Sequence, residues 1–350
     1  MSIALDATYS LGENLSGVGV YSRELLYGLA AAHPEAEFLW CYRPHRLRAS
    51  LSERIPGNCH RRLLQEPIGP RRASIFHGLN QRLPRIRLRG MISTFHDLFV
   101  LTGDYSTPEF RRRFAEQAKQ AAAGSEAIIT VSAFTARQVE ELLRVEPARI
   151  HVVHHGITAR PAVTVARERI ILHVGAIQLR KNLVRLVEAF EQVDRSWRLV
   201  LAGSAGFGAE RIFQHIESSP ARNRIEITGY VTSAELASWY ARAQVFAFPS
   251  LDEGFGIPLV EAMDAGVPVL TSNRSALPEV VGNAALLIDP EDTGELTDAL
   301  RRLTIDEDLR TDLIGRGKRR ALEFSWTAAV ARTWAVYQNL LTGSHRPPLF

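Results

Sequence analysis

The stretch Phe248–Met263, FPSLDEGFGIPLVEAM, combines the end of an apolar strand, a glycine-containing turn and the start of a helix. Pro258 suits the first turn of a helix, because its missing N–H would have no partner there and its φ is already helical. Gly254 and Gly256 allow backbone N–H groups to approach a ligand closely, and a helix N-terminus favours anionic oxygens. The stretch therefore predicts a strand–turn–helix unit whose turn binds a ligand.

The same order of strand, loop and helix recurs along the chain. In the first half, strands are predicted at 3–5, 37–42, 75–77, 91–95, 127–131 and 150–154, with helices at 20–32, 107–123 and 133–143. In the second half, strands are predicted at 170–174, 198–202, 225–228, 245–248, 269–272 and 284–288, with helices at 183–192, 233–241, 258–265 and 291–304. Alternation of this kind favours parallel sheets covered by helices on both faces.

The length of 350 residues suggests two domains of about 150 residues each, with a single large α/β barrel as the competing architecture. An unpatterned segment at 156–168 separates the two sets of elements. We therefore predict an α/β fold with two Rossmann-like doubly wound domains, at 1–160 and 168–325, followed by a final amphipathic helix at 326–342.

Composition excludes several classes of protein. Apolar residues make up 46% and charged residues 23% of the chain, which is typical of globular proteins and not of disordered ones. Two cysteines cannot form a zinc site alone, and they favour a reducing compartment. No secretory leader and no apolar run of about 18 residues is visible, so the prediction is a cytoplasmic protein.

The formal charge of +4 conceals a strongly basic segment. Residues 43–89 contain twelve arginines and no lysine, against Glu53 and Glu66 as the only acids, so this segment carries +10. Two interpretations stay open: a solvated surface in a chain that prefers arginine, or a site for anionic lipid head groups or a phosphorylated acceptor. The segment lacks interleaved aromatic residues, so we predict no nucleic-acid partner.

Two glutamates flank the glycines of the opening stretch. Glu253 lies in the turn and Glu261 in the helix, where carboxylates accept hydrogen bonds from sugar hydroxyls on either side of a bound diphosphate. With its surroundings, PSxxEGFGxPxxEAMxxGxPV, the pair resembles the donor-sugar motif of the retaining glycosyltransferases of family 4, which have the GT-B fold. The resemblance implies that Glu253 contacts the transferred sugar and Glu261 the nucleotide ribose. It also places Gly254, Phe255, Gly256 and Ile257 in the donor-binding site.

A second motif follows the predicted strand 170–174. Gly175 is followed by the pair Arg180 and Lys181, and a departing diphosphate needs such compensating positive charge. The segment is similar to the family's glycine-to-Arg-Lys phosphate element. It departs from the pattern at Ala176, where many members have another arginine, so the division of the diphosphate charge stays open. An exposed basic pair capping a loop is the alternative.

Weaker signals lie in the first half. Ser16-Gly17-Val18-Gly19 follows the first strand as a glycine-rich loop, which in the family reaches the donor phosphate; an ordinary strand-to-helix turn is the alternative. His96 and Asp97 end the strand 91–95, and they resemble the family's His-Asp pair beside the donor sugar. In that interpretation His96 forms a hydrogen bond with the sugar and Asp97 orients His96. The alternative is a structural role, which is more common for a lone histidine at a strand end.

Two further segments belong to the second half. Val231, after Gly229-Tyr230, resembles the residue whose backbone binds the nucleotide base, and the following helix is predicted to have Ser233 as its N-cap. Asp306-Glu307-Asp308 matches a metal-binding D-x-D pattern of another transferase fold. It lies at a charged helix start, so we interpret it as solvated surface and predict no metal site.

The resemblance extends over residues 3–340. It implies a hexosyltransferase that uses no cofactor, takes its sugar from a nucleotide diphosphate sugar and retains the anomeric configuration by metal-independent front-face substitution. The first domain would bind a glycan or lipid-linked acceptor, the second the donor across a cleft, and the last helix would return to the first domain. The sequence motifs RKNL and PSLxEGFGIP are most similar to those of bacterial mannosyltransferases of polysaccharide assembly. This similarity favours GDP-mannose as the sugar donor.

Several alternatives remain open at this stage. The donor would otherwise be UDP-glucose or a related nucleotide sugar. A nucleotide-sugar 2-epimerase or a non-catalytic nucleotide-sugar-binding protein would share the architecture. A cytoplasmic enzyme with a lipid-linked acceptor would lie at the inner face of the plasma membrane, in contact with anionic lipid through residues 43–89.

Overall fold

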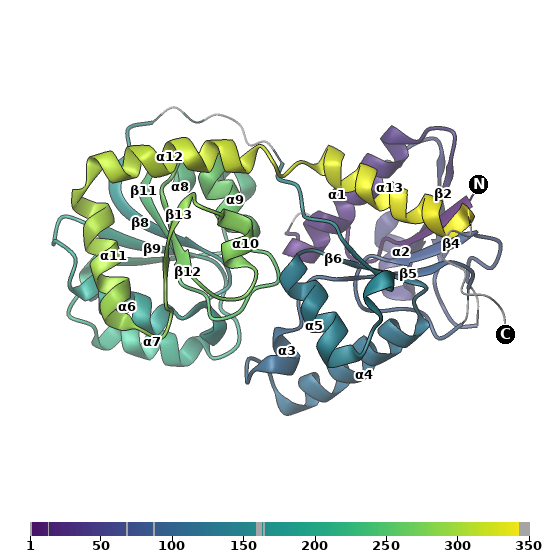
Figure 1. The fold of residues 1–350 in the computed structure, drawn as a ribbon, viewed down its shortest axis with the longest axis horizontal. Helices are drawn as coiled ribbons and strands as arrows, with labels where there is room; N and C mark the ends of the chain where they lie inside the picture. The colour runs from purple at the N-terminus through teal and green to yellow at the C-terminus, as the bar shows by residue number, and fades with distance from the viewer. Residues whose placement is uncertain are drawn as a thin grey trace. The chain divides into compact units, whose positions relative to one another are not determined.

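The computed structural model describes residues 2–12, 14–67, 69–86, 88–158, 163 and 165–342. The chain forms two compact units (Figure 1). The first contains residues 1–102, 107–156 and 325–350, and the second contains residues 103–106 and 157–324. Two separate open sheets replace the single barrel that the length alone allowed.

The first unit is built on a parallel sheet in the order β3-β2-β1-β4-β5-β6-β7. Its strands are β1 (Ser2–Asp6), β2 (Glu37–Tyr42), β3 (Cys59–Leu63), β4 (Ile75–Gly78), β5 (Met91–Phe95), β6 (Ala127–Thr130) and β7 (Ile150–Val152). Its helices are α1 (Gly17–Ala32), α2 (Pro44–Ser50), α3 (Phe99–Thr102), α4 (Pro108–Gly124), α5 (Ala133–Leu143) and α13 (Trp326–Thr342). The central strands β1, β4 and β5 are buried apart from Ser2 at the start of β1, as expected for a parallel sheet covered on both faces.

The last helix completes the first unit, as predicted. Helix α13 packs along α1 (Figure 1), where a Cβ on Gly28 would lie only 2.6 Å from Val330. Its Tyr337 is fully buried, and the phenol lies 2.6 Å from Nδ1 of His77 on β4. The end of the chain therefore supplies part of the core that the first half begins.

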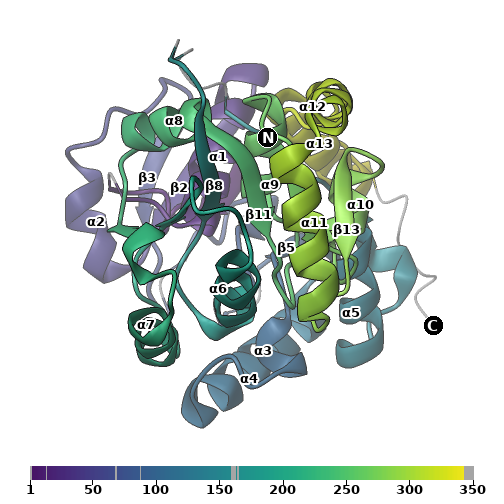
Figure 2. The same ribbon diagram turned by 90° about the vertical axis from the view of Figure 1, so that its left-hand side faces the viewer.

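The second unit has a parallel sheet in the order β10-β9-β8-β11-β12-β13. Its strands are β8 (Glu168–Val174), β9 (Arg198–Ala202), β10 (Ile225–Gly229), β11 (Ala243–Phe248), β12 (Val269–Ser272) and β13 (Ala285–Ile288). Its helices are α6 (Leu183–Glu191), α7 (Ala209–Ser218), α8 (Ser233–Arg242), α9 (Ile257–Asp264), α10 (Leu277–Val281), α11 (Thr293–Ile305) and α12 (Glu307–Ala321). Figure 2 shows the labelled helices α6, α7, α8 and α11 around this sheet. Val245 and Ala247 of β11 pack with α6, α7 and α11, whereas Phe246 contacts Tyr240 of α8. Alternate residues of the strand thus serve opposite helix layers.

Most of the predicted bounds shift by one to three residues in the structure. Helix α1 begins at Gly17 and not at Val20, because Ser16 caps it by accepting a hydrogen bond from the N–H of Gly19 at 3.3 Å. Thr232, not Ser233, caps α8, in a capping box with Glu235. The predicted segment 156–168 falls partly outside the described residues, and its last residue, Glu168, already belongs to β8.

The acidic start of the helix α12 behaves as predicted. Asp306 is the N-cap, and its carboxylate accepts a hydrogen bond from the N–H of Leu309 at 2.8 Å. Glu307 and Asp308 follow in the first turn, where negative charge complements the helix dipole. No helix in the described part of the chain is long and apolar enough to cross a membrane.

Candidate active site

The strongest sequence motifs meet at one edge of the second sheet. Strands β8 and β11 are parallel neighbours, so the loops at their carboxyl ends lie together. The loop after β8 carries Arg180 and Lys181, and the loop after β11 carries Glu253. The N–H of Leu251 donates to the carbonyl of Arg180 at 2.9 Å, which ties the two loops directly.

Glu253 lies between the two cations. Nη1 of Arg180 is 2.7 Å from Oε2 of Glu253, and Nζ of Lys181 pairs with Oε1 of the same carboxylate. The same Arg180 nitrogen also donates to the carbonyl of Asp252. All three charged residues of the cluster are less than a tenth exposed. The sequence predicted the roles of these residues separately, and the structure joins them in one ion-pair cluster.

The electrostatics of the cluster keep Glu253 ionised. Burial raises the pKa of a carboxyl, but the charges and hydrogen bonds of Arg180 and Lys181 outweigh it and lower the pKa of Glu253 to about 2. Nζ of Lys181 also lies 4.5 Å from the centre of the Phe248 ring. Glu253, Arg180 and Lys181 together carry one net positive charge, which suits an anionic ligand.

A buried histidine lies behind the cluster. His173 of β8 is fully buried, stacks on Phe248 at 5.4 Å and has its Nδ1 3.0 Å from the carbonyl of Ala247. Burial, assisted by the charge of Lys181, lowers its pKa to about 3, so the ring is neutral. Sequence reasoning missed His173, because a histidine inside an apolar strand carries no motif.

Glycines shape the turns around the cluster. Gly256, the N-cap of α9, has φ +97°, and a Cβ there would lie 3.0 Å from Leu277 and 3.1 Å from Leu259. Gly175 has φ +144°, and its carbonyl would lie 1.9 Å from a Cβ on Gly203. Only glycine fits these positions without strain. Gly254 lies in the turn before α9 and Ile257 is the first residue of that helix, while the ring of Phe255 is buried edge-on against Phe324 at 5.5 Å.

Glu261 has different surroundings from those of Glu253. It lies on α9, half-buried, and its Oε2 accepts a hydrogen bond from the Tyr240 phenol of α8 at 3.0 Å. Val231 is half-buried just before the capped start of that helix, after Gly229, whose φ is +70°. Both residues assigned to the nucleoside are thus placed by α8 and its neighbour α9.

The first unit brings together the weaker motifs. Gly19 lies in the first turn of α1, where a Cβ would be 2.9 Å from the carbonyl of Tyr9, and Gly17 begins the same turn. Tyr21, in the next turn, contacts His96 edge-on at 4.7 Å. Asp97 is half-buried beside His96 at the end of β5. The structure therefore joins the start of α1 to the strand end that carries His96.

His96 is held as a neutral ring. Its Nε2 lies 2.9 Å from the carbonyl of Leu79 and so carries the proton and donates. Burial lowers its pKa to about 4, against a smaller opposing effect of that hydrogen bond. His155 is buried and stacks parallel to His96 at 5.5 Å.

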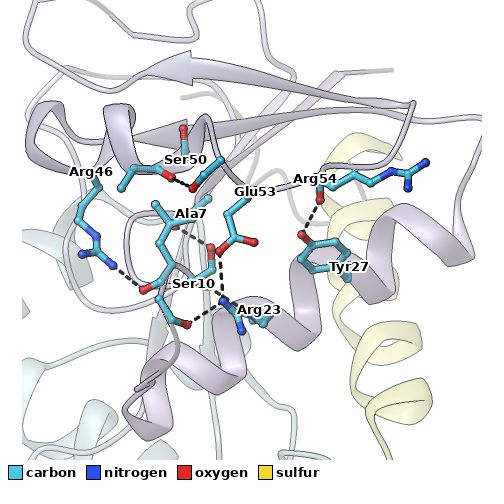
Figure 3. A network of polar contacts seen from close by, with 12 residues as sticks. Ala7, Ser10, Arg23, Tyr27, Arg46, Ser50, Glu53 and Arg54 are labelled. Carbon is cyan, nitrogen blue, oxygen red and sulfur yellow. Dashed lines mark hydrogen bonds and ion pairs between the residues drawn. The ribbon is translucent and has the colours of Figure 1, made fainter.

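Two arginines hold the loop after β1, next to the glycine-containing turn (Figure 3). Arg23 of α1 donates to the carbonyls of Ser10 and Gly12 at 3.0 and 2.9 Å. Arg46 of α2 donates to the carbonyl of Leu11 at 2.5 Å. Sequence reasoning missed Arg23, and it counted Arg46 only as part of a basic segment.

The basic segment is thus divided in the structure. Arg43, Arg46, Arg61 and Arg82 are only partly exposed and bond to nearby protein groups. The exposed arginines are Arg48, Arg54, Arg62, Arg71, Arg72, Arg85 and Arg89, and Arg87 lies outside the described residues. The charge of +10 therefore exceeds what this surface presents to a partner.

The two parallel sheets covered by helices match the fold of solved GT-B glycosyltransferase structures. Sucrose-phosphate synthase from Thermosynechococcus elongatus has this fold, with a TM-score of 0.80 at 21% identity over 98% of this chain and 99% of that one. Anabaena Alr3699/HepE in complex with UDP-glucose has a TM-score of 0.73 at 17% identity, over 97% and 99% of the two chains.

Sequence comparison names the family. Residues 15–160 match the model of Glycosyltransferase Family 4, and residues 159–320 match that of the group 1 glycosyl transferases. The O-antigen chain mannosyltransferase B of Escherichia coli is 31% identical, over 95% of this chain and 99% of that protein. The chain belongs to this family of glycosyltransferases.

The buried histidines make stability depend on pH. His77 and His173 are fully buried and both have a pKa near 3, mainly because burial disfavours the charged ring. An unfolded histidine has its pKa at about 6.5, so below that pH the unfolded state binds more protons than the folded one. We expect the free energy of unfolding to fall as the pH is lowered from 6.5 to 4. Each of the two histidines contributes a decrease of up to about 1.4 kcal/mol per pH unit.

Urea unfolding at pH 7.5, 5.5 and 4.5 measures this effect. The change of the unfolding free energy with pH should be smaller in His173→Gln than in the wild-type protein. It should be unchanged in His45→Gln, since His45 is exposed. Equal stability of the wild-type protein at pH 7.5 and 5.5 would contradict the prediction.

Proposed function

We propose that this chain is a retaining hexosyltransferase that moves mannose from GDP-mannose to a hydroxyl of a glycan or lipid-linked glycan. One observation carries the proposal: Arg180, Lys181 and Glu253 form a buried cluster with net positive charge at the carboxyl edge of the second sheet. Charge in such a desolvated place is preorganised for a leaving diphosphate. The donor therefore binds the second unit and the acceptor the first.

The proposed chemistry needs little from the protein beyond position and charge. Arg180, Lys181 and the N-terminus of α9 stabilise the diphosphate as the bond to the sugar breaks, in the place that a divalent ion has in other transferases. Glu253 remains a carboxylate, orients both cations and accepts hydrogen bonds from the sugar. The acceptor hydroxyl attacks from the face that the diphosphate leaves, and a phosphate oxygen takes its proton, so the configuration is retained.

His96 contributes a neutral contact to the sugar in this proposal. With Nε2 donating to Leu79, the other ring nitrogen is an acceptor for a sugar hydroxyl. Its pKa of about 4 keeps it uncharged near neutral pH, so it would not compete with the cations for the diphosphate. Gly17 and Gly19 supply the close backbone approach beside it.

The choice of mannose and of the acceptor is supported by the E. coli relative, an O-antigen chain mannosyltransferase. A polysaccharide acceptor carried on lipid would bring the enzyme to the inner face of the plasma membrane, where the seven exposed arginines favour anionic lipid. UDP-glucose is the competing donor, since it is the ligand of the Anabaena neighbour.

Calorimetry against GDP, UDP, GDP-mannose and UDP-glucose, with donor hydrolysis followed in parallel, tests the proposal. We expect GDP-mannose to bind most tightly and to be hydrolysed slowly without an acceptor, with α-mannose as the first product by NMR. If UDP-glucose binds more tightly than GDP-mannose, the proposed donor is wrong. If β-mannose is the first product of hydrolysis, the proposed retention of configuration is wrong. Release of a 2-epimerised sugar would indicate an epimerase. Binding of a nucleotide sugar without turnover would indicate a binding protein. If none of the four ligands binds, the whole proposal is refuted.

A further inference from the structure

A cavity lies within the first unit. Its volume is about 530 Å³, within the range of about 300–1,000 Å³ that is typical of small-molecule sites. Its walls are Arg43 to His45 after β2, Leu64 to Glu66 after β3, and Arg82 to Pro84 with Ile86 after β4. These strands are parallel members of one sheet, so the cavity lies at its carboxyl edge, where α/β sheets bind ligands.

The walls of the cavity are held by hydrogen bonds between loops. The N–H of Arg85 donates to Oε1 of Glu66 at 2.6 Å, which joins the loops after β3 and β4. The N–H of Arg43 donates to the Thr8 hydroxyl at 3.2 Å, which joins the loops after β1 and β2. The cavity is therefore a formed pocket and not a gap between unconnected loops.

Arg82 brings an unbalanced positive charge to this pocket. Its Nη1 donates to the phenol of Tyr9 at 2.7 Å, and its guanidinium lies 5.9 Å from the centre of that ring. Among the residues that the structure describes, no carboxylate forms an ion pair with Arg82. A guanidinium has five N–H donors, so a neutral phenol leaves most of them for a ligand.

Arg43 adds a second guanidinium. It lies 3.5 Å from the carboxylate of Asp6, which is 1% exposed. Its Nε is buried without a hydrogen-bond partner in the described part of the chain. A buried donor without a partner costs about 1–3 kcal/mol, so its place in a pocket wall points to a ligand acceptor. Arg46, three residues on, bonds loop carbonyls and does not add to the site.

We infer that this pocket binds a phosphate group carried by the acceptor. Arginine forks match the oxygens of a phosphate in pairs, and an open pocket leaves room for the sugar attached to it. The inference rests on the proposed function, because only a transferase has an acceptor. It adds that this acceptor carries a phosphate group. The same chemistry fits the phosphate of a soluble sugar phosphate and that of a lipid head group.

Calorimetry on the full chain with mannose 6-phosphate, inorganic phosphate and mannose tests the pocket, all in the Lys181→Ala background so that the donor site contributes little. We expect the two phosphates to bind and mannose to bind at least tenfold more weakly. Arg82→Gln should weaken both phosphates at least tenfold, and Arg43→Lys should do the same while keeping a charge opposite Asp6. Equal affinity for mannose and its phosphate, or unchanged affinity in both variants, would overturn the inference.

Two matched variants exclude trivial causes. Arg48→Gln removes an exposed arginine of α2 outside the pocket and should leave phosphate affinity within twofold. Tyr9→Phe removes the phenol that Arg82 bonds but keeps the guanidinium, and it should retain most of the affinity. Equal losses in Arg48→Gln and Arg82→Gln would refute a localised site. A loss in Tyr9→Phe as large as that in Arg82→Gln would show a structural effect and also refute it.

The source of the phosphate is decided by sedimentation with vesicles of phosphatidylglycerol or phosphatidylcholine. Loss of phosphatidylglycerol binding in Arg82→Gln but not in Arg48→Gln would assign the pocket to a lipid phosphate, and no difference would assign it to a soluble one. Nucleotide binding and donor hydrolysis by the wild-type chain are measured separately. Their absence would refute the proposed function and leave phosphate binding by Arg82 standing.

Discussion

Replacing Lys181 by alanine should reduce kcat/KM for sugar transfer by about 10²–10³-fold, the loss typical when one preorganised charge is removed from a developing anion. Lys181 is 6% exposed and pairs with Glu253 in the ligand-free site. Without it, the cluster changes from a net positive charge to a neutral Arg180–Glu253 pair. The affinity for the nucleoside diphosphate should fall together with kcat, because the same charge stabilises the bound and the departing diphosphate.

Lys119→Ala is the matched control for this variant. Lys119 lies exposed on α4 in the first unit, so its removal changes the net charge equally and should leave kcat/KM within twofold. Steady-state kinetics with GDP-mannose and calorimetry with GDP measure both effects. If Lys181→Ala retains the wild-type GDP affinity and turnover while its thermal stability is unchanged, the assigned role of Lys181 is wrong.

Glu253→Gln should lower the free energy of unfolding by about 3–5 kcal/mol, the usual cost of removing one partner from a buried ion pair. The pKa of about 2 means that this carboxylate is charged at every ordinary pH, so glutamine always removes a charge. Arg180 and Lys181 would then remain buried without their counter-ion. Turnover should fall as well, because the two cations lose the group that orients them.

The same substitution eight residues later provides the comparison. Glu261 bonds the Tyr240 phenol and is half-buried, and a glutamine oxygen can accept that hydrogen bond. Glu261→Gln should therefore cost at most about 1 kcal/mol in urea unfolding, the net worth of an ordinary hydrogen bond. Equal losses of stability in the two variants would contradict the buried ion-pair cluster. A double variant, Glu253→Gln with Lys181→Met, should recover part of the stability and none of the activity.

Some elements with continuous apolar runs or clear helical periods were predicted to the residue, whereas β8 and β11 each begin two residues before the predicted start. The bounds of β2, β5, β9, β12 and α5 agree with the prediction, because central parallel strands and well-capped helices have patterns that neighbouring turns interrupt sharply. Helix α5 begins directly after Ser132, whose hydroxyl accepts from the N–H of Thr135, a local signal that the sequence contains in full.

Elements with only partial burial were missed or, in the case of α12, predicted only at their acidic start. In β3, CHRRL, the buried Cys59 and the partly buried Arg61 and Leu63 alternate with exposed residues, so the edge strand has no apolar run. Helix α12, EDLRTDLIGRGKRRA, buries little beyond Leu313, Gly317 and Ala321. Helix α12 packs closely on α9, where a Cβ added to Gly317 would lie 3.2 Å from the side chain of Met263, and no local pattern predicts this contact.

The sequence by itself determined the two sets of strands and helices, the family resemblance and the identity of Glu253, Arg180 and Lys181, because each rests on short-range spacing. Only the tertiary structure decided that Glu253 neutralises one of these two cations. Their loops are 72 residues apart in the chain and meet because β8 and β11 are neighbours in the sheet. The tertiary structure likewise decided which arginines of residues 43–89 are partly exposed and which are exposed. A count of charges in the sequence does not show which of them contact other protein groups. Burial, which sets the charge of Glu253 and of the histidines, arises only when distant elements exclude water together.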